Sequence, residues 1–196
     1  MKTLMLAALL SITGVAAQAV TVGNDLINRP SADGWGNFSM IYTDLTLSEG
    51  TLTSWSAYGA RSGLASLLVV SENAGTPGTG YNVEGVFDMT LTAGQVTTTA
   101  INFDVEDGWL LGLYQGAGRV DFRYSRGPTN IRFTPNNAGQ PTAGTLLATP
   151  NGRNNQVRTY SFSAELAAVP LPAALPLLGL SLLGLCAMGR RRVLAA

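Results

Sequence analysis

The chain has 196 residues, with twelve Lys and Arg, twelve Asp and Glu, and no His. The lack of His excludes Ser-His-Asp and Cys-His catalysis and His-ligated zinc. Eight arginines and all twelve acidic residues fall in residues 20–168, so this part carries a net charge of −4 and is a poor partner for nucleic acid or anionic lipid. The single cysteine, Cys186, lies outside it, so its stability must come from a hydrophobic core rather than from disulfides.

Residues 1–19 have the features of a secretory signal peptide. Lys2 precedes an apolar run that is too short to span a bilayer, and Ala17-Gln18-Ala19 is a small-x-small site for signal peptidase. Cleavage after Ala19 leaves Val20 as the first residue. The alternative, a buried N-terminal helix, does not account for the order of these features.

Residues 20–168 predict an all-β domain. Short runs of β-branched and aromatic residues recur between Gly, Pro and Asn-rich turns, and no long helical pattern is present. We expect eight to ten strands with spacings of roughly 8 to 14 residues, which favours an antiparallel β-sandwich of jelly-roll type. The clearest runs are 51–59, 64–72, 81–92, 95–105, 109–115, 119–125, 130–135 and 156–166, and residues 135–154 are expected to form a long loop.

Strict alternation assigns faces to three of these strands. In 51–59 it groups Leu52 with Ser54, Ser56 and Tyr58, and places Trp55 on the opposite face. In 81–92 it groups Val83, Gly85, Phe87 and Met89. In 156–166 it groups Tyr160, Phe162 and Ala164. The continuous apolar run 64–72 is typical of a strand buried on both faces.

The C-terminal stretch predicts a membrane span. Between Val169 and Gly189 the only polar side chains are Ser181 and Cys186, and a helix over about 174–189 can cross the hydrocarbon. The cluster Arg190, Arg191 and Arg192 is expected to stay in the cytoplasm, with residues 20–168 outside. The alternative is a plain stop-transfer anchor with no further role.

The order of features in residues 169–196 resembles the VPLPA form of the PEP-CTERM sorting signal. The pentapeptide Val169, Pro170, Leu171, Pro172 and Ala173 is followed by a single span and an arginine cluster. The resemblance implies recognition and cutting at this motif by an exosortase in the inner membrane of a Gram-negative bacterium. It also implies release to the cell surface or extracellular matrix, alongside exopolysaccharide and biofilm. Two prolines keep such a motif out of helix and sheet, so that an enzyme can grip it.

The segment from Gly50 to Tyr114 is similar to a jelly-roll domain of other exported bacterial proteins. In Gly108-Trp109-Leu110-Leu111-Gly112, Trp109 stands where that domain has an aspartate. The resemblance implies a fold and no chemistry.

Aromatic side chains are one candidate binding feature, because flat rings stack on sugars. Trp35 is flanked by glycines and is expected in an exposed loop, whereas core packing is the alternative for Trp55 and Trp109. The full set of candidate rings is Trp35, Trp55, Trp109, Tyr58, Tyr81 and Tyr114.

Carboxylates are the other candidate. Asp104, Glu106 and Asp107 supply hard oxygen ligands for a structural calcium ion, although Asp107-Gly108 also forms a turn. Two carboxylates of this group, or separately Glu84 with Asp88, could also act as a pair in glycoside hydrolysis, which requires two carboxylates flanking a cleft. The alternative for both sets is a solvated strand edge.

Three hypotheses follow. The first is a non-enzymatic, envelope-sorted protein with a structural or adhesive role and no required cofactor. The second is a carbohydrate-binding module that recognises exopolysaccharide. The third is a glycan-active enzyme, which needs two carboxylates in one cleft.

Overall fold

The computed structural model describes residues 19–32, 36–116, 123–127, 130–134, 138–149 and 158–168. All of them belong to one compact unit, Gln18–Ala168. Strands and turns make up this part, and none of its residues is helical. No helix long and apolar enough to cross a membrane therefore occurs in it, and residues 174–189 lie outside it. The prediction of an all-β domain is confirmed.

Thirteen strands occur in the described residues, and every pairing among them is antiparallel. They are β1 (Ala19–Gly23), β2 (Ser31–Ala32), β3 (Phe38–Thr46), β4 (Gly50–Tyr58), β5 (Gly63–Glu72), β6 (Gly80–Leu91), β7 (Val96–Val105), β8 (Leu110–Gln115), β9 (Arg123–Arg126), β10 (Ile131–Phe133), β11 (Leu146–Ala148), β12 (Arg158–Tyr160) and β13 (Phe162–Ala168).

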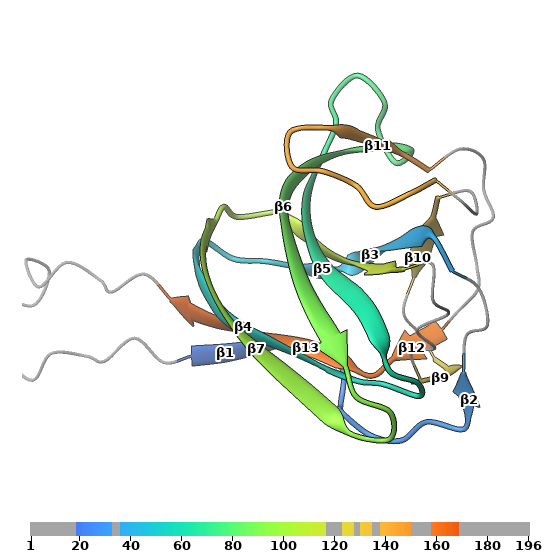
Figure 1. The fold of residues 1–196 in the computed structure, drawn as a ribbon. Helices are drawn as coiled ribbons and strands as arrows, with labels where there is room; N and C mark the ends of the chain where they lie inside the picture. The colour runs from blue at the N-terminus through green and yellow to red at the C-terminus, as the bar shows by residue number, and fades with distance from the viewer. Residues whose placement is uncertain are drawn as a thin grey trace, which may run out of the picture. The chain divides into compact units, whose positions relative to one another are not determined.

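The strands form three sheets. Four strands pair in the order β1-β13-β4-β7, six in the order β10-β3-β8-β5-β6-β11, and three short ones in the order β12-β9-β2. Figure 1 shows β5 and β6 curving strongly along their length. Turns with Gly at positive φ separate several strands, as at Gly94 and at Gly108, where the sequence predicts a turn.

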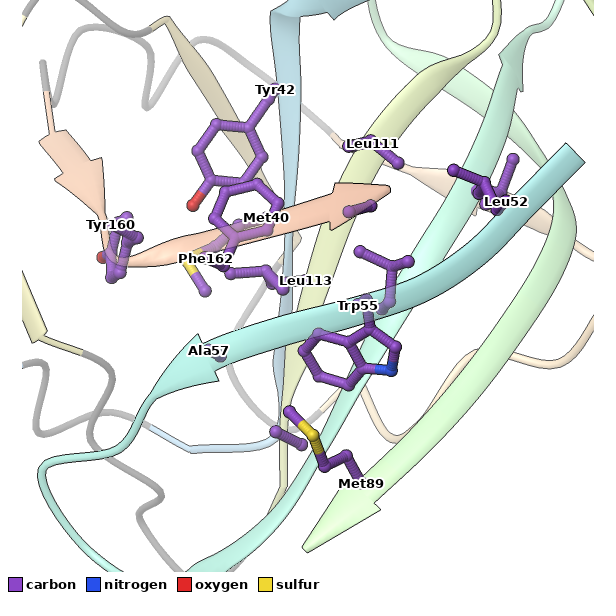
Figure 2. Packing of buried hydrophobic residues seen from close by; sticks show 14 of the residues in the cluster. Met40, Tyr42, Leu52, Trp55, Ala57, Met89, Leu111, Leu113, Tyr160 and Phe162 are labelled. Carbon is purple, nitrogen blue, oxygen red and sulfur yellow. The ribbon is translucent and has the colours of Figure 1, made fainter. Parts of the chain in front are cut away.

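The main core draws side chains from both large sheets. Trp55 and Leu52 of β4 contribute to it from the four-stranded sheet, and Met40, Met89 and Leu113 contribute from the six-stranded sheet. Figure 2 shows the Trp55 indole among these residues. Burial of this apolar surface is the main source of stability in a domain without disulfides.

The six-stranded sheet also buries its other face. On β5, Ala65, Leu67 and Val69 belong to the main core, and Leu68 and Val70 belong to a second cluster. Leu147 of β11, the edge strand of the same sheet, is also part of this second cluster, and the Gln140 amide donates a hydrogen bond to Ser66 of β5. The prediction that residues 64–72 form a strand is confirmed, and its burial on both faces holds for residues 65–70, whereas Leu64 and Glu72 are exposed.

Two bulges overturn the predicted faces of β4 and β6. Leu52 and Trp55 both lie in the main core, because Thr53 is an extra residue between the pairs Leu52↔Leu166 and Ser54↔Glu165. Likewise Val83 lies in the second cluster, while Phe87 and Met89 face the main core. The β5–β6 register shifts at this point, between Val69 and Val70. Strict alternation fails wherever a strand carries such an extra residue.

Some elements differ from the sequence-based expectation. β3 is a nine-residue strand whose first five residues are all buried, and it was not predicted. The expected strand 156–166 is divided into two strands, β12 and β13, by a bend at Ser161. Tyr160, Phe162 and Ala164 all face the main core, as expected. β11 lies within the expected loop 135–154.

Candidate functional site

Trp55 belongs to the core. Its side chain has 0% exposure and lies on β4 between β13 and β7, so it cannot stack on a sugar. Its indole Nε1 is buried and has no hydrogen-bond partner within the described part of the chain. The prediction of a possible sugar-binding role for Trp55 is therefore wrong, and the core alternative is right.

Trp109 is half-buried and packs against the edge of the main core. Its ring centroid lies 6.3 Å from that of Phe103, and Phe103 lies 5.1 Å from Phe87 in an edge-on arrangement. All three rings are partly exposed. We call Phe87, Phe103 and Trp109 the aromatic cluster. Each of its side chains is half-buried, as are those of Tyr58, Tyr124 and Phe133.

Local backbone bonds position the aromatic cluster. The Trp109 N–H donates to the carbonyl of Glu106, and its own carbonyl accepts from the N–H of Leu47, which follows β3. Gly85 of β6 leaves room for the rings: a Cβ there would lie 2.8 Å from an atom of the Phe87 ring and 3.1 Å from Phe103. Phe87 and Phe103 were not among the predicted site residues, because they come near Trp109 only through the packing of strands from different sheets.

The predicted calcium ligands are spread along a strand end and a turn. Asp104, on β7, accepts a hydrogen bond of 2.7 Å from the Thr51 hydroxyl, while Glu106 and Asp107 are exposed beside Gly108. Within the described residues, no three acidic or thiol side chains gather in a group that could hold a metal ion. Asp107-Gly108 forms the turn that the sequence predicted.

Glu84 and Asp88 have separate hydrogen-bond partners. Glu84 accepts from Ser71 at 2.7 Å. Asp88 accepts from Ser66 and from the Gln140 amide, each at 2.7 Å. These bonds tie β6 to β5 and to the segment around Gln140, which is a structural use of the carboxylates.

The candidate tyrosines pack within the domain and do not form an exposed surface for stacking on sugars. Burial raises the pKa of both Tyr81 and Tyr114 above its ordinary value, because the phenolate would be poorly solvated. The positive charge of Arg132 opposes part of this rise in the pKa of Tyr81, and the Tyr114 hydroxyl donates to Asn37 at 3.1 Å. Tyr58 is half-buried and donates to the Gly94 carbonyl.

The remaining predicted positions lie outside the described residues, except one. Trp35, Ala17, the motif 169–173 and the cluster 190–192 are not described. Ala19 is exposed at the start of β1, where it lies opposite Ala167 of β13.

Comparison with known proteins found no matching family model, no matching characterised protein and no matching solved structure.

Proposed function

We propose that the chain is an exported protein of the cell envelope or extracellular matrix, sorted through its C-terminal signal and without enzymatic activity. Its parts are a signal peptide (1–19), an extracytoplasmic domain (20–168) and a VPLPA-type sorting signal (169–196). The two large antiparallel sheets with a shared core support a jelly-roll-like β-sandwich for the domain. The role is structural or adhesive, in association with exopolysaccharide.

The observation that carries this proposal is the pairing of β1 with β13. Ala19 lies opposite Ala167, so the first and last strands of the domain begin and end at the same end of one sheet. Figure 1 shows these two strand ends next to each other. The proposed signal peptide and sorting signal thus join the domain at neighbouring points, which suits a domain presented from a membrane on one side.

The chemistry of the domain supports a non-enzymatic role. It has no His and no Cys. The carboxylates of Asp104, Glu84 and Asp88 each accept hydrogen bonds from Ser, Thr or Gln side chains. Covalent catalysis needs a nucleophile that a neighbouring base or charge activates. None of these hydrogen bonds joins a Ser or Thr hydroxyl to such a base within a catalytic triad.

The test is substitution of the sorting motif in a bacterium that has an exosortase. Pro170→Ala combined with Pro172→Ala should leave the chain uncut in the inner-membrane fraction. The matched control is Pro176→Ala, beyond the pentapeptide, which should be cut and released like the parent chain. Equal release of all three chains would overturn the sorting proposal.

A second candidate function is binding of exopolysaccharide, and the aromatic cluster favours it. Partly exposed rings of Phe87, Phe103 and Trp109 offer the apolar surface on which sugar rings stack. Affinity gel electrophoresis in exopolysaccharide, with and without calcium, tests it. Trp109→Ala should abolish retardation, and Phe133→Ala, which removes another half-buried ring, should not. Absence of retardation for the parent chain would remove this candidate.

A further inference from the structure

β7 is a long edge strand that is uncharged over most of its length. β7 is the last strand in the order β1-β13-β4-β7, and no described strand pairs with its other side. From Val96 to Phe103 it has neither a charged residue nor a proline. Soluble proteins usually protect such an edge with charge, proline or short length. Charge and proline are both missing over these eight positions. With ten residues, β7 is not protected by short length either.

The backbone bonds of the neighbouring turn show which groups point outward. The Gly59 N–H donates to the Gln95 carbonyl, and the Tyr58 N–H donates to Ser161 on the far side of β4. Because bonding alternates along an antiparallel pair, the β4 residues opposite Val96, Thr98 and Ala100 direct their backbone groups away from β7. The N–H and C=O groups of those three β7 residues therefore face out from the sheet.

These three residues are also exposed through their side chains. Val96 is 43% exposed, and Thr98 and Ala100 are exposed as well. The ladder with β4 is regular over Val96–Ala100 and shifts only beyond Ala100. This regular stretch has Thr98 at its centre.

We propose that two copies of the chain associate through antiparallel pairing of β7 with β7, on a two-fold axis at Thr98. Thr98 then faces Thr98 of the second copy, and Val96 of each copy faces Ala100 of the other. Every one of these residues directs its backbone groups outward, so each facing pair exchanges two hydrogen bonds. The two four-stranded sheets become one continuous sheet. The proposal does not depend on the sorting signal or on sugar binding.

Charge favours a second copy over a charged partner. In this register the one charged residue of β7, Asp104, falls opposite Thr92 rather than opposite another carboxylate. Like charges facing each other across strands would oppose pairing, and Thr–Thr pairs support it. The same stretch of β7 can therefore serve as both sides of the interface, as a two-fold interface requires.

Sedimentation velocity on the full chain in mild detergent tests the proposal. The parent chain should form a dimer. Thr98→Lys places two ammonium groups on the axis and should raise the dissociation constant about tenfold or more. Thr98→Asp should do the same, and an equimolar mixture of the two variants should restore a dimer. Thr90→Lys, with the same charge at an exposed position of β6, should dimerise like the parent chain.

Thr98 also exchanges a hydrogen bond of 2.8 Å with Ser56, so loss of the hydroxyl needs its own control. Thr98→Ala removes the hydroxyl without adding charge and should still dimerise. Circular dichroism shows whether each variant keeps its sheets. A parent chain that stays monomeric up to about 0.1 mM, or folded lysine and aspartate variants that dimerise as well as the parent, would overturn the proposal.

Discussion

Leu52 and Trp55 point into the same core although three positions separate them on β4. In a regular strand an odd separation places two side chains on opposite faces. Here Thr53 has no partner in the ladder with β13, and its hydroxyl donates to the Glu165 carbonyl at 3.3 Å. The bulge thus keeps both large side chains buried, at 0% exposure each.

Deletion of Thr53 tests this role. It leaves Leu52 and Trp55 two positions apart, so both can face the core without a bulge, and we expect a folded domain of reduced stability. Deletion of Ser56 places Trp55 and Ala57 on opposite faces, and should lower the free energy of unfolding by about 3 kcal/mol or more. Urea unfolding followed by near-UV circular dichroism measures both. Equal losses would contradict the bulge interpretation.

The contrast between the tryptophans gives a second prediction. Trp55→Ala leaves a large cavity in the main core and should cost about 3 to 5 kcal/mol of unfolding free energy. Trp109→Ala removes a half-buried ring and should cost clearly less. Chemical denaturation of both variants, compared with the parent chain, checks the order. If Trp109→Ala is the more damaging change, the assignment of Trp55 to the core centre fails.

Alkaline pH should destabilise the domain. Burial raises the pKa of Tyr81 and Tyr114 in the folded state, so the folded chain holds these protons more tightly than the unfolded chain. Their contribution to stability is complete below about pH 10, the pKa of an unfolded tyrosine, and is lost as the pH rises through the folded-state values. Melting temperatures from pH 8 to 11 should fall above pH 10, and less steeply for the double variant Tyr81→Phe/Tyr114→Phe. A flat profile would contradict the burial of these hydroxyls.

Gly85 controls the packing of the aromatic cluster. An added Cβ would approach the Phe87 ring to 2.8 Å, so Gly85→Ala should shift the rings and cost about 1 to 3 kcal/mol. Gly94→Ala is the control, because its Cβ meets nothing within 4 Å and its φ of +71° costs only about 1 to 2 kcal/mol of backbone strain. The near-UV circular dichroism spectrum should change for Gly85→Ala alone. The same spectrum for both variants would show that Gly85 does not set the ring positions.

The all-β class, the doubly buried β5 and the turns at Gly94 and Gly108 follow from local patterns of the sequence. An apolar run of strand length and glycine in a turn carry their own signals. The bulges do not, because the extra residue is defined by the neighbouring strands and not by its own side chain. β3 was missed for a related reason: its first five residues, from Phe38 on, are buried on both faces and therefore lack a two-residue alternation.

The candidate site was predicted only in part. Core packing, the alternative for Trp109, agrees with the structure in part, because Trp109 packs against the core that contains Leu111 and Leu113 but is itself only half-buried. Phe87 and Phe103 could not be associated with it, since they come from β6 and β7 and meet Trp109 only after the two sheets pack. The sequence likewise placed Asp104, Glu106 and Asp107 together, although strand geometry directs Asp104 toward Thr51.

Mass spectrometry of both chain ends in the mature protein tests the central proposal most directly. The protein should be recovered from the surface or medium of a bacterium that has an exosortase. The proposal predicts a first residue of Val20 and a C-terminus within or directly after residues 169–173. Recovery of a chain that begins at Met1 and ends at Ala196 would contradict it.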